Sequence, residues 1–406
     1  MLVASSTPKL VAATGLAVFA ALVVHFLAQA ISTRRRFYKT KAIGIPIITV
    51  IEPELCSQLT QETPQPRHFQ IGWALTPVTD GIDLLSMNMA DHKVWRSRLN
   101  PGFSSRNVIQ NMPEVLEEVS TFAQKLKDTA DADSQEWGNM FTLYDRAIAL
   151  TFDVISRFAL DLHLHEQTSG PGPLLKALRN LIPLIKLNNI KNSCWVFYEI
   201  NKHPGILQKL RIEHDQVLGS DPKSANKVLQ ESPHKLNELH YTTAVIKETL
   251  RIHPLANTLR QGSHNFNFSL DGIQYPTYDC LIQTTPAMTH IHPDLWPRPT
   301  DFIPNRFLVP NNHALYPVKN AWRAFELGNT RCIGQELAML ELKLALVFTV
   351  RELDFDINYE LWDKMQKRET SGAAPETVNG ERAYSCGGGT GVVKDDLPIR
   401  YHVFLG

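Results

Sequence analysis

This 406-residue chain has no excess of positive or negative charge, because 41 Lys and Arg residues balance 41 Asp and Glu residues. The composition therefore gives no reason to expect a nucleic-acid partner. The five cysteines are odd in number and lack the spacing of a zinc finger or a disulfide framework, which favours a reducing compartment. Internal repeats and long low-complexity tracts are also absent. The hydrophobic content of 43% describes a globular chain with a substantial core.

A long apolar run is present near the start of the chain, at residues 10–31. As a helix this run would be about 33 Å long, enough to cross a hydrocarbon core of about 30 Å. A cleaved signal peptide is disfavoured because the run is long and no small-x-small cleavage site clearly follows. The basic residues 34–36 come next, and the positive-inside rule places them in the cytosol. We expect a membrane anchor at residues 1–33 and one cytosolic domain at residues 34–406.

The stretch around Cys332 combines one cysteine, two glycines and a predicted helix. Apolar residues spaced three and four apart over residues 337–348 predict an amphipathic helix, so Cys332 lies at or just before its first turn. The unpaired N–H groups and the helix dipole at that point favour a thiolate. Gly328 and Gly334 flank the cysteine and would let a flat ligand approach closely. Such a thiolate is compatible with a redox thiol, a catalytic nucleophile or an axial ligand of haem iron.

Phe325 completes the pattern F-x-x-G-x-x-x-C-x-G, whose other fixed positions are Gly328, Cys332 and Gly334. This pattern resembles the haem-binding loop of the cytochrome P-450 family. The resemblance implies that Cys332 is the axial thiolate ligand of haem iron and that Phe325, Gly328 and Gly334 lie beside the cofactor. It favours this role over a buried structural cysteine. A thiol-dependent enzyme would also need a general base, and the sequence nominates none.

Two further motifs stand before the cysteine loop, in the order that the family has them. Glu248 and Arg251 are three residues apart on a predicted helix, so their side chains share one face. The segment Phe302–Phe307 resembles the family's F-x-P-x-R-F motif and contains Arg306. The resemblance implies a buried network of Glu248, Arg251 and Arg306 that holds the cysteine loop in one geometry. Removing one partner would leave a buried unpaired charge, at a cost of about 3–5 kcal/mol.

Residues that contact the haem propionates are also implied by the resemblance. His92 and Arg96 are four apart and share a face of one predicted helix, and Arg260 precedes a pair of predicted strands. The alternative for Arg96 is a solvated position on a surface helix, and the alternative for Arg260 is a surface salt bridge. The arginine that the family usually has two residues before the cysteine is replaced by Thr330, and Arg331 directly precedes the cysteine. We therefore count Arg331 among the expected cofactor-binding residues.

The expected fold class is mainly α with a small β region, similar to the P-450 fold, with an N-terminal transmembrane helix. Apolar periodicity predicts helices at residues 91–99, 115–126, 148–159, 174–187, 195–200 and 206–218. Strands are predicted at residues 46–51, 266–273 and 281–284, and a β hairpin region at residues 377–404. The glycine-rich residues 386–391 predict a turn rather than a nucleotide-binding loop, because no helix follows. The pairs His163/His165 and His290/His292 lack a third metal ligand.

One segment of the family pattern is missing from the chain. The central helix of the family carries an Ala/Gly-Gly-x-Asp/Glu-Thr segment that relays protons to bound O2, and no such segment is present. The chain passes from the helix predicted to end near residue 187 to what resembles the end of the central helix. The opening sheet is also abbreviated. We expect a truncated P-450-like fold, without an acid–threonine pair and without the apolar wall on the distal face of the haem.

The function implied by the resemblance is that of a haem-thiolate monooxygenase. It would insert one oxygen atom of O2 into an apolar small molecule in secondary-metabolite biosynthesis, as fungal membrane-bound members do. Electrons would come from an NADPH-dependent reductase, because nothing in the sequence binds a flavin or a nicotinamide. The anchor implies the endoplasmic reticulum membrane, with the catalytic domain in the cytosol. The alternative is a catalytically incompetent remnant that at most binds haem, since oxygen activation without a positioned proton donor is slow.

Overall fold

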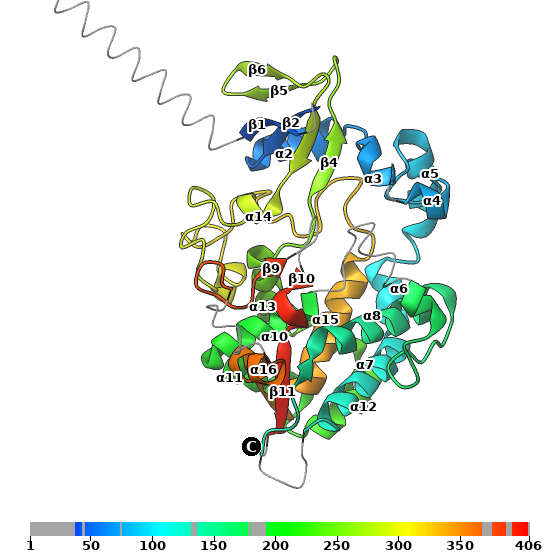
Figure 1. Cartoon of the computed structure of the whole chain (residues 1–406), viewed down its shortest axis with the longest axis vertical. Coiled ribbons are helices and arrows are strands. Elements are labelled where there is room, and N and C mark those ends of the chain that lie inside the picture. Colours follow the sequence, from blue (N-terminus) through cyan, green and yellow to red (C-terminus); the bar gives the residue numbers. More distant parts are fainter. Residues whose placement is uncertain are drawn as a thin grey trace, which may run out of the picture.

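The computed structural model describes residues 37–42, 45–73, 75–130, 136–177, 179, 192–367, 376–386 and 392–404. Helices are the main type of secondary structure in these residues, and a four-stranded sheet lies at one end of the molecule, beside the helical body (Figure 1). The predicted fold class, mainly α with a small β region, is confirmed. The predicted transmembrane run at residues 10–31 lies outside the described residues. Of the helices that the structure describes, none is both long and apolar enough to cross a membrane.

The helical body is built around α7 (Met112–Lys127), α8 (Leu143–Leu160), α13 (His240–Ile252) and α15 (Gln335–Thr349). Each of these helices buries an apolar stripe in one shared core, as an amphipathic helix of a globular protein does. The stripe of α7 includes Val115, Val119, Phe122 and Leu126. The other helices of the body are α6 (Ser105–Gln110), α10 (Asn192–Lys202), α11 (Pro204–Leu218), α12 (Ala225–Glu231) and α16 (Tyr359–Met365).

The four-stranded sheet joins distant parts of the chain. Its order is β1-β2-β7-β4, formed by β1 (Phe37–Ala42), β2 (Ile45–Val50), β7 (Leu281–Thr284) and β4 (Thr258–Gln261). β2 pairs with β7 in parallel, whereas the other two pairs are antiparallel. A second core under the sheet includes α2 (Pro53–Ser57), the π-helical turn η1 (Gln58–Glu62) and the hairpin of β5 (Asn267–Leu270) and β6 (Ile273–Pro276).

The remaining strands lie against the helical body. β11 (Pro398–Val403) pairs with β8 (Leu353–Ile357) and with β3 (Phe141–Thr142). β9 (Ser385–Cys386) and β10 (Val392–Val393) form a short antiparallel pair. The region predicted as a β hairpin, residues 377–404, therefore contains only one short antiparallel pair, β9 with β10. Its third strand, β11, pairs with strands from other parts of the chain. The predicted glycine turn falls mostly on residues 387–391, outside the described part.

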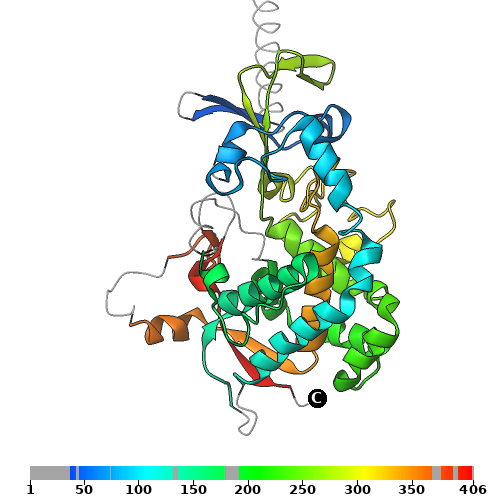
Figure 2. The same ribbon diagram turned by 90° about the vertical axis from the view of Figure 1, so that its right-hand side faces the viewer.

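Three short helices lead from the sheet to the helical body (Figures 1 and 2). They are α3 (Phe69–Trp73), α4 (Thr76–Thr79) and α5 (Met89–Leu99). Every residue of α5 is exposed except His92, which is buried, and Arg96, which is half-buried. Even its large apolar side chains face solvent, with Trp95 at 42% and Val94 at 46% exposure. α5 therefore depends on contacts of its polar side chains for its position.

Several predicted elements agree with the structure, and one strand was missed. The strands predicted at residues 46–51 and 281–284 are β2 and β7, and the helices predicted at residues 115–126 and 206–218 are parts of α7 and α11. Arg260 precedes the predicted strands as expected, but it lies in β4, a strand that was not predicted, and its backbone pairs with Ile282 of β7. The helix predicted at residues 174–187 falls largely outside the described residues.

Candidate functional site

Cys332 lies at the end of a loop that a backbone hydrogen bond closes. The Cys332 N–H donates to the Phe325 carbonyl at 2.9 Å, which forms a tight turn just before α15. Within this turn Gly328 has a φ of +84°, and a Cβ there would lie 2.2 Å from the Thr60 carbonyl oxygen. Glycine is therefore required at this position. Gly334 is the N-cap residue of α15, and its backbone N–H interacts with the Cys332 sulfur.

The thiol of Cys332 is partly buried, and this burial raises its pKa above the usual range. The Gly334 N–H and the Arg96 guanidinium oppose that shift. The start of the helix therefore favours the thiolate, as expected, but burial outweighs both groups in the chain alone. A bound metal ion would supply the positive charge that keeps the sulfur ionised at neutral pH.

Two of the predicted propionate-binding arginines reach the cysteine loop from different elements. Arg96, on α5, donates from Nη1 to the Arg331 carbonyl at 2.8 Å and from Nε to Asn100 Oδ1 at 2.6 Å. Arg260, on β4, donates from Nη2 to the Thr330 hydroxyl. The replacement of the family's arginine by Thr330 thus leaves a hydrogen-bond acceptor for Arg260. Both contacts bring a cation to the residues directly before the cysteine.

Arg67 joins this cluster and was missed by the sequence analysis. Its backbone forms an isolated β-bridge with Arg260, and its Nη1 donates to the Met87 carbonyl at 2.7 Å. Its Nη2 lies 3.3 Å from Nε2 of His92, the residue predicted to act with Arg96. No local pattern marks Arg67, because the bridge joins segments that are far apart in the chain. The cluster consists of Arg67, His92, Arg96 and Arg260, and we call it the basic cluster.

The basic cluster is short of negative charge. Burial, followed by the charges of Arg260 and Arg96, lowers the pKa of Arg67 to about 10. Burial also lowers the pKa of Arg260 to about 10. Burial and the three arginines lower the pKa of His92 to about 4, so its ring is neutral. The buried Nε of Arg260 has no hydrogen-bond partner among the described residues. A ligand with two carboxylates would pair well with these guanidinium groups.

The structure brings together the three charged residues of the other two motifs. Glu248 and Arg251 of α13 and Arg306 of η4 (Pro304–Phe307) are all fully buried. Glu248 Oε2 lies 2.8 Å from Arg251 Nε, and its Oε1 lies 3.0 Å from Arg306 Nε. Arg251 also donates from Nη1 to the His290 carbonyl at 2.7 Å. The Trp296 ring packs against both guanidinium groups, at 5.1 and 5.7 Å.

Other predicted residues lie outside the basic cluster. The Arg331 side chain is exposed, so only its carbonyl takes part. Phe325 packs against Trp322, with ring centroids 6.1 Å apart. The rings of His163 and His165 are 6.1 Å apart. Within the part of the chain that the structure describes, no group of three His, Cys, Asp or Glu residues is placed to hold a metal ion.

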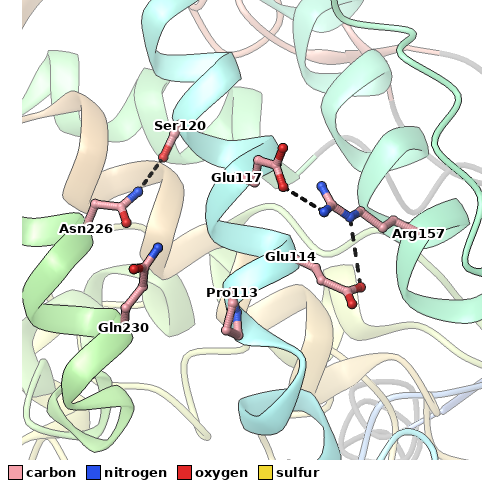
Figure 3. Close-up of a pocket in the computed structure, with 7 residues that line it drawn as sticks. All are labelled: Pro113, Glu114, Glu117, Ser120, Arg157, Asn226 and Gln230. Carbon is pink, nitrogen blue, oxygen red and sulfur yellow. Dashed lines mark hydrogen bonds and ion pairs between the residues drawn. The ribbon is translucent and has the colours of Figure 1, made fainter.

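Two cavities lie away from the cysteine loop. The first, of about 380 Å³, lies between α7, α8 and α12 (Figure 3). Some of its polar groups pair with one another, since Arg157 pairs with Glu117 at 2.6 Å and Asn226 donates to Ser120 at 3.1 Å (Figure 3). The second, of about 460 Å³, lies beside the start of α8 and includes Phe141 in its wall. Neither cavity has a wall residue in the basic cluster.

Comparison with known proteins identifies the family. Residues 188–377 match the family model described as Cytochrome P450. The chain is 30% identical to the cytochrome P450 monooxygenase polC of Polytolypa hystricis, over 88% of this chain and 79% of that protein. The chain belongs to the cytochrome P450 family. Two other P450 relatives are acrF of Aspergillus aculeatus, 26% identical over 86% of this chain and 90% of that protein, and ptmG of Penicillium ochrochloron, 31% identical over 75% and 56%.

P450 proteins bind haem through a cysteine thiolate, and the residues of this site fit that cofactor. Cys332 would supply the sulfur ligand from a loop in which Gly328 packs closely against the Thr60 carbonyl. The basic cluster offers three guanidinium groups for the two propionates, among them that of Arg260, whose Nε has no hydrogen-bond partner in the described part of the chain. The bound iron would also remove the cost of keeping the buried sulfur ionised.

Proposed function

We propose that this P450 is a monooxygenase that inserts one oxygen atom of O2 into an apolar small molecule of secondary metabolism. The observation that carries this proposal is the convergence of the basic cluster on the residues directly before Cys332. The names of the relatives, all cytochrome P450 monooxygenases, support the type of reaction. The substrate class follows from the resemblance to fungal members of the family.

The residues of the chain have separate roles in this proposal. Cys332 would bind the iron as a thiolate, and the haem would supply the activation of O2. Arg67, Arg96 and Arg260 would hold the propionates. Glu248, with its two arginines, keeps the cysteine loop in one position, because any displacement would leave buried charges unpaired.

The remaining partners are proposed with the same reaction. An NADPH-dependent reductase would supply the electrons, because no motif for a flavin or a nicotinamide is present in the sequence. The apolar run at residues 10–31 would anchor the chain in the endoplasmic reticulum membrane, in contact with its lipid, and the following basic residues would place the catalytic domain in the cytosol.

A second candidate function is haem binding without oxygen insertion, and one observation favours it. The alignment with polC covers 448 positions, more than the 406 residues of this chain, so that relative has segments with no counterpart here. The family match begins at residue 188, where the central helix of the family was predicted to be shortened. A chain without the acid–threonine pair would lack the proton donor that oxygen activation needs.

The first test is the absorption spectrum of the reduced, CO-bound protein. We expect the spectrum of thiolate-ligated haem, and we expect Cys332→Ala to abolish it. Cys386→Ser is the matched control, because Cys386 is also partly exposed and lies outside the cysteine loop. A thiolate spectrum that persists in Cys332→Ala would disprove the ligand assignment.

The second test separates the two candidates. With a reductase, NADPH and a panel of apolar substrates, a monooxygenase would form hydroxylated product in proportion to the NADPH it consumes. A protein that only binds haem would consume NADPH slowly and release peroxide without product. Haem-thiolate binding combined with that second result would overturn the monooxygenase proposal.

A further inference from the structure

A second buried ion pair lies in the stretch directly before the cysteine turn. The Arg323 side chain is almost fully buried, and its Nη2 contacts Glu326 Oε1. The same Nη2 donates to the Thr60 hydroxyl of η1 at 2.7 Å. Glu326 accepts a hydrogen bond from the Thr284 hydroxyl of β7 at 2.9 Å. Hydrogen bonds of this ion pair therefore connect the stretch before Cys332 to η1 and to β7, two elements at the sheet end of the molecule.

His290 connects this pair to the buried network of Glu248. Its Nε2 accepts from the Arg323 N–H at 2.9 Å, and its Nδ1 lies 3.0 Å from the Arg251 carbonyl. Because the carbonyl can only accept, Nδ1 carries the proton and the ring is neutral. The His290 carbonyl in turn accepts from Arg251 Nη1. A continuous line of contacts thus runs from Glu248 to Glu326.

Glu326 is connected to two buried cations. It pairs with Arg323, and it accepts a hydrogen bond from Thr284 of β7, the strand that pairs with β4, which carries Arg260. Its negative charge opposes the effect of burial on the pKa of Arg260. Arg323 Nε and Nη1 have no hydrogen-bond partner among the described residues, so Arg323 depends strongly on this one carboxylate. Glu326 also has a φ of +59°, a conformation that costs free energy for any residue other than glycine. The surrounding contacts must outweigh that cost.

We propose that Arg323 and Glu326 are positioning residues of the haem-thiolate site. The pair fixes the path of the chain before Cys332, and Glu326 balances the charge of Arg260 beside the propionates. The part of the proposal that concerns the loop stands on the geometry of the chain alone. The part that concerns the propionates rests on the proposed function.

The loop is tested on the protein without haem, by the rate at which a small alkylating reagent modifies Cys332. A Cys386→Ser background removes the other partly exposed cysteine, since Cys56, Cys194 and Cys280 are buried. We expect Glu326→Gln and Arg323→Met each to raise the rate about tenfold, because an unpaired buried charge opens the loop more often. Circular dichroism checks that each variant is folded.

A matched control is available in the same helical body. Arg351 is also buried and pairs with Asp215 at 2.8 Å, and neither residue contacts the cysteine loop. Arg351→Met removes a similarly buried arginine, whose partner Asp215 is half exposed, and should leave the alkylation rate unchanged. Thr284→Val gives a milder change, because it removes one hydrogen bond of Glu326 and leaves the ion pair intact. It should raise the rate less than Glu326→Gln does. Rates in Glu326→Gln and Thr284→Val equal to that of the unmutated chain would overturn the proposal.

The charge balance is tested on the haem-loaded protein by the reduction potential of the iron. Glu326→Gln removes a negative charge near the propionate arginines, so we expect a higher potential and a smaller fraction of thiolate-ligated haem. Glu326→Asp keeps the charge and should restore the potential. An unchanged potential in Glu326→Gln would overturn this part. If the unmutated chain binds no haem through Cys332, the proposed function fails, and the alkylation rates still decide the role of the pair.

Discussion

Glu341 is a carboxyl group buried inside the helical body, on α15, where Thr151 Oγ1 donates a hydrogen bond to it. Burial raises its pKa to about 7 from a usual value near 4.5. Because the folded-state pKa is the higher one, the folded state binds this proton more tightly than the unfolded state does. The free energy of unfolding should therefore fall as the pH rises from about 4.5 to about 7, by roughly 3 kcal/mol for this group.

Glu341→Gln tests this pH dependence, because it keeps the shape and the acceptor for Thr151 without a charge. The variant should be more stable than the unmutated chain at pH 8, by up to about 3 kcal/mol, and nearly equal to it at pH 4.5. Urea unfolding followed by circular dichroism measures both values. Glu336→Gln, at an exposed position on the same helix, is the control and should change little at either pH. An equal effect of Glu341→Gln at both pH values would contradict the raised pKa.

Gly328 is a second residue whose surroundings predict the effect of a substitution. An added Cβ would overlap the Thr60 carbonyl, and the positive φ disfavours any other residue. Gly328→Ala should cost more than about 2 kcal/mol of stability and reduce the thiolate-ligated fraction of haem. Thermal unfolding and the CO-bound spectrum measure the two effects. Gly205→Ala, at the start of α11 where no atom lies within 4 Å of the new Cβ, should be neutral. Similar results for both variants would show that the loop can move aside.

The residues of the site differ in how far the sequence could predict them. The cysteine, its glycines and the residues of the charged network stand in short motifs, so their spacing alone brings them to notice. Arg67 and Arg323 stand in no such pattern. Arg67 reaches the site through a β-bridge with Arg260, and Arg323 through the Thr60 hydroxyl in η1. Such contacts depend on how distant segments meet, which periodicity cannot report.

The secondary-structure elements also differ in how well the sequence predicts them. α7, α8, α11 and α13 bury apolar stripes of helical period, so local sequence predicts them well. β1, β4 and β8 were missed, because each takes its hydrogen bonds from a partner strand. The π-helical turn η1 has no sequence signature, although its Thr60 contacts both Gly328 and Arg323.

α5 gives a prediction at the scale of an element. It is exposed along nearly its whole length, and its ties to the rest of the molecule include the contacts of Arg96 and His92. Haem propionates would add partners for both residues, so haem should hold α5 in place. Tryptic cleavage at Lys93 and Arg98 should slow at least about fivefold when haem binds.

Mass spectrometry of the fragments measures the rate at each site. Lys209, exposed on α11 and outside the basic cluster, is the internal control, and its cleavage should not change. If cleavage in α5 is as fast with haem as without it, the propionates are not held by this helix.

At the scale of the whole molecule, the segment predicted to be missing near residue 188 would decide what the protein can do. The described residues include those proposed for the proximal side of a P450 site, while the alignment with polC covers more positions than this chain has residues. We predict that the mature transcript contains a longer coding segment between the codons of residues 187 and 194, and that this segment encodes the acid–threonine motif. Sequencing the transcript across that interval tests the prediction. A transcript identical to the present sequence would instead favour the chain that binds haem without oxygen insertion.

The parallel pairing of β2 with β7 has a consequence for synthesis of the chain. Thr49 and Gln283, which meet in this pair, are 234 residues apart. At about 5–20 residues per second, the ribosome needs roughly 10 to 50 s to make the second strand after the first. During that time β1 and β2 can form only a hairpin, with the inner edge of β2 unpaired and open to other chains. The nascent protein should therefore need a chaperone most during this interval, well before any cofactor can bind.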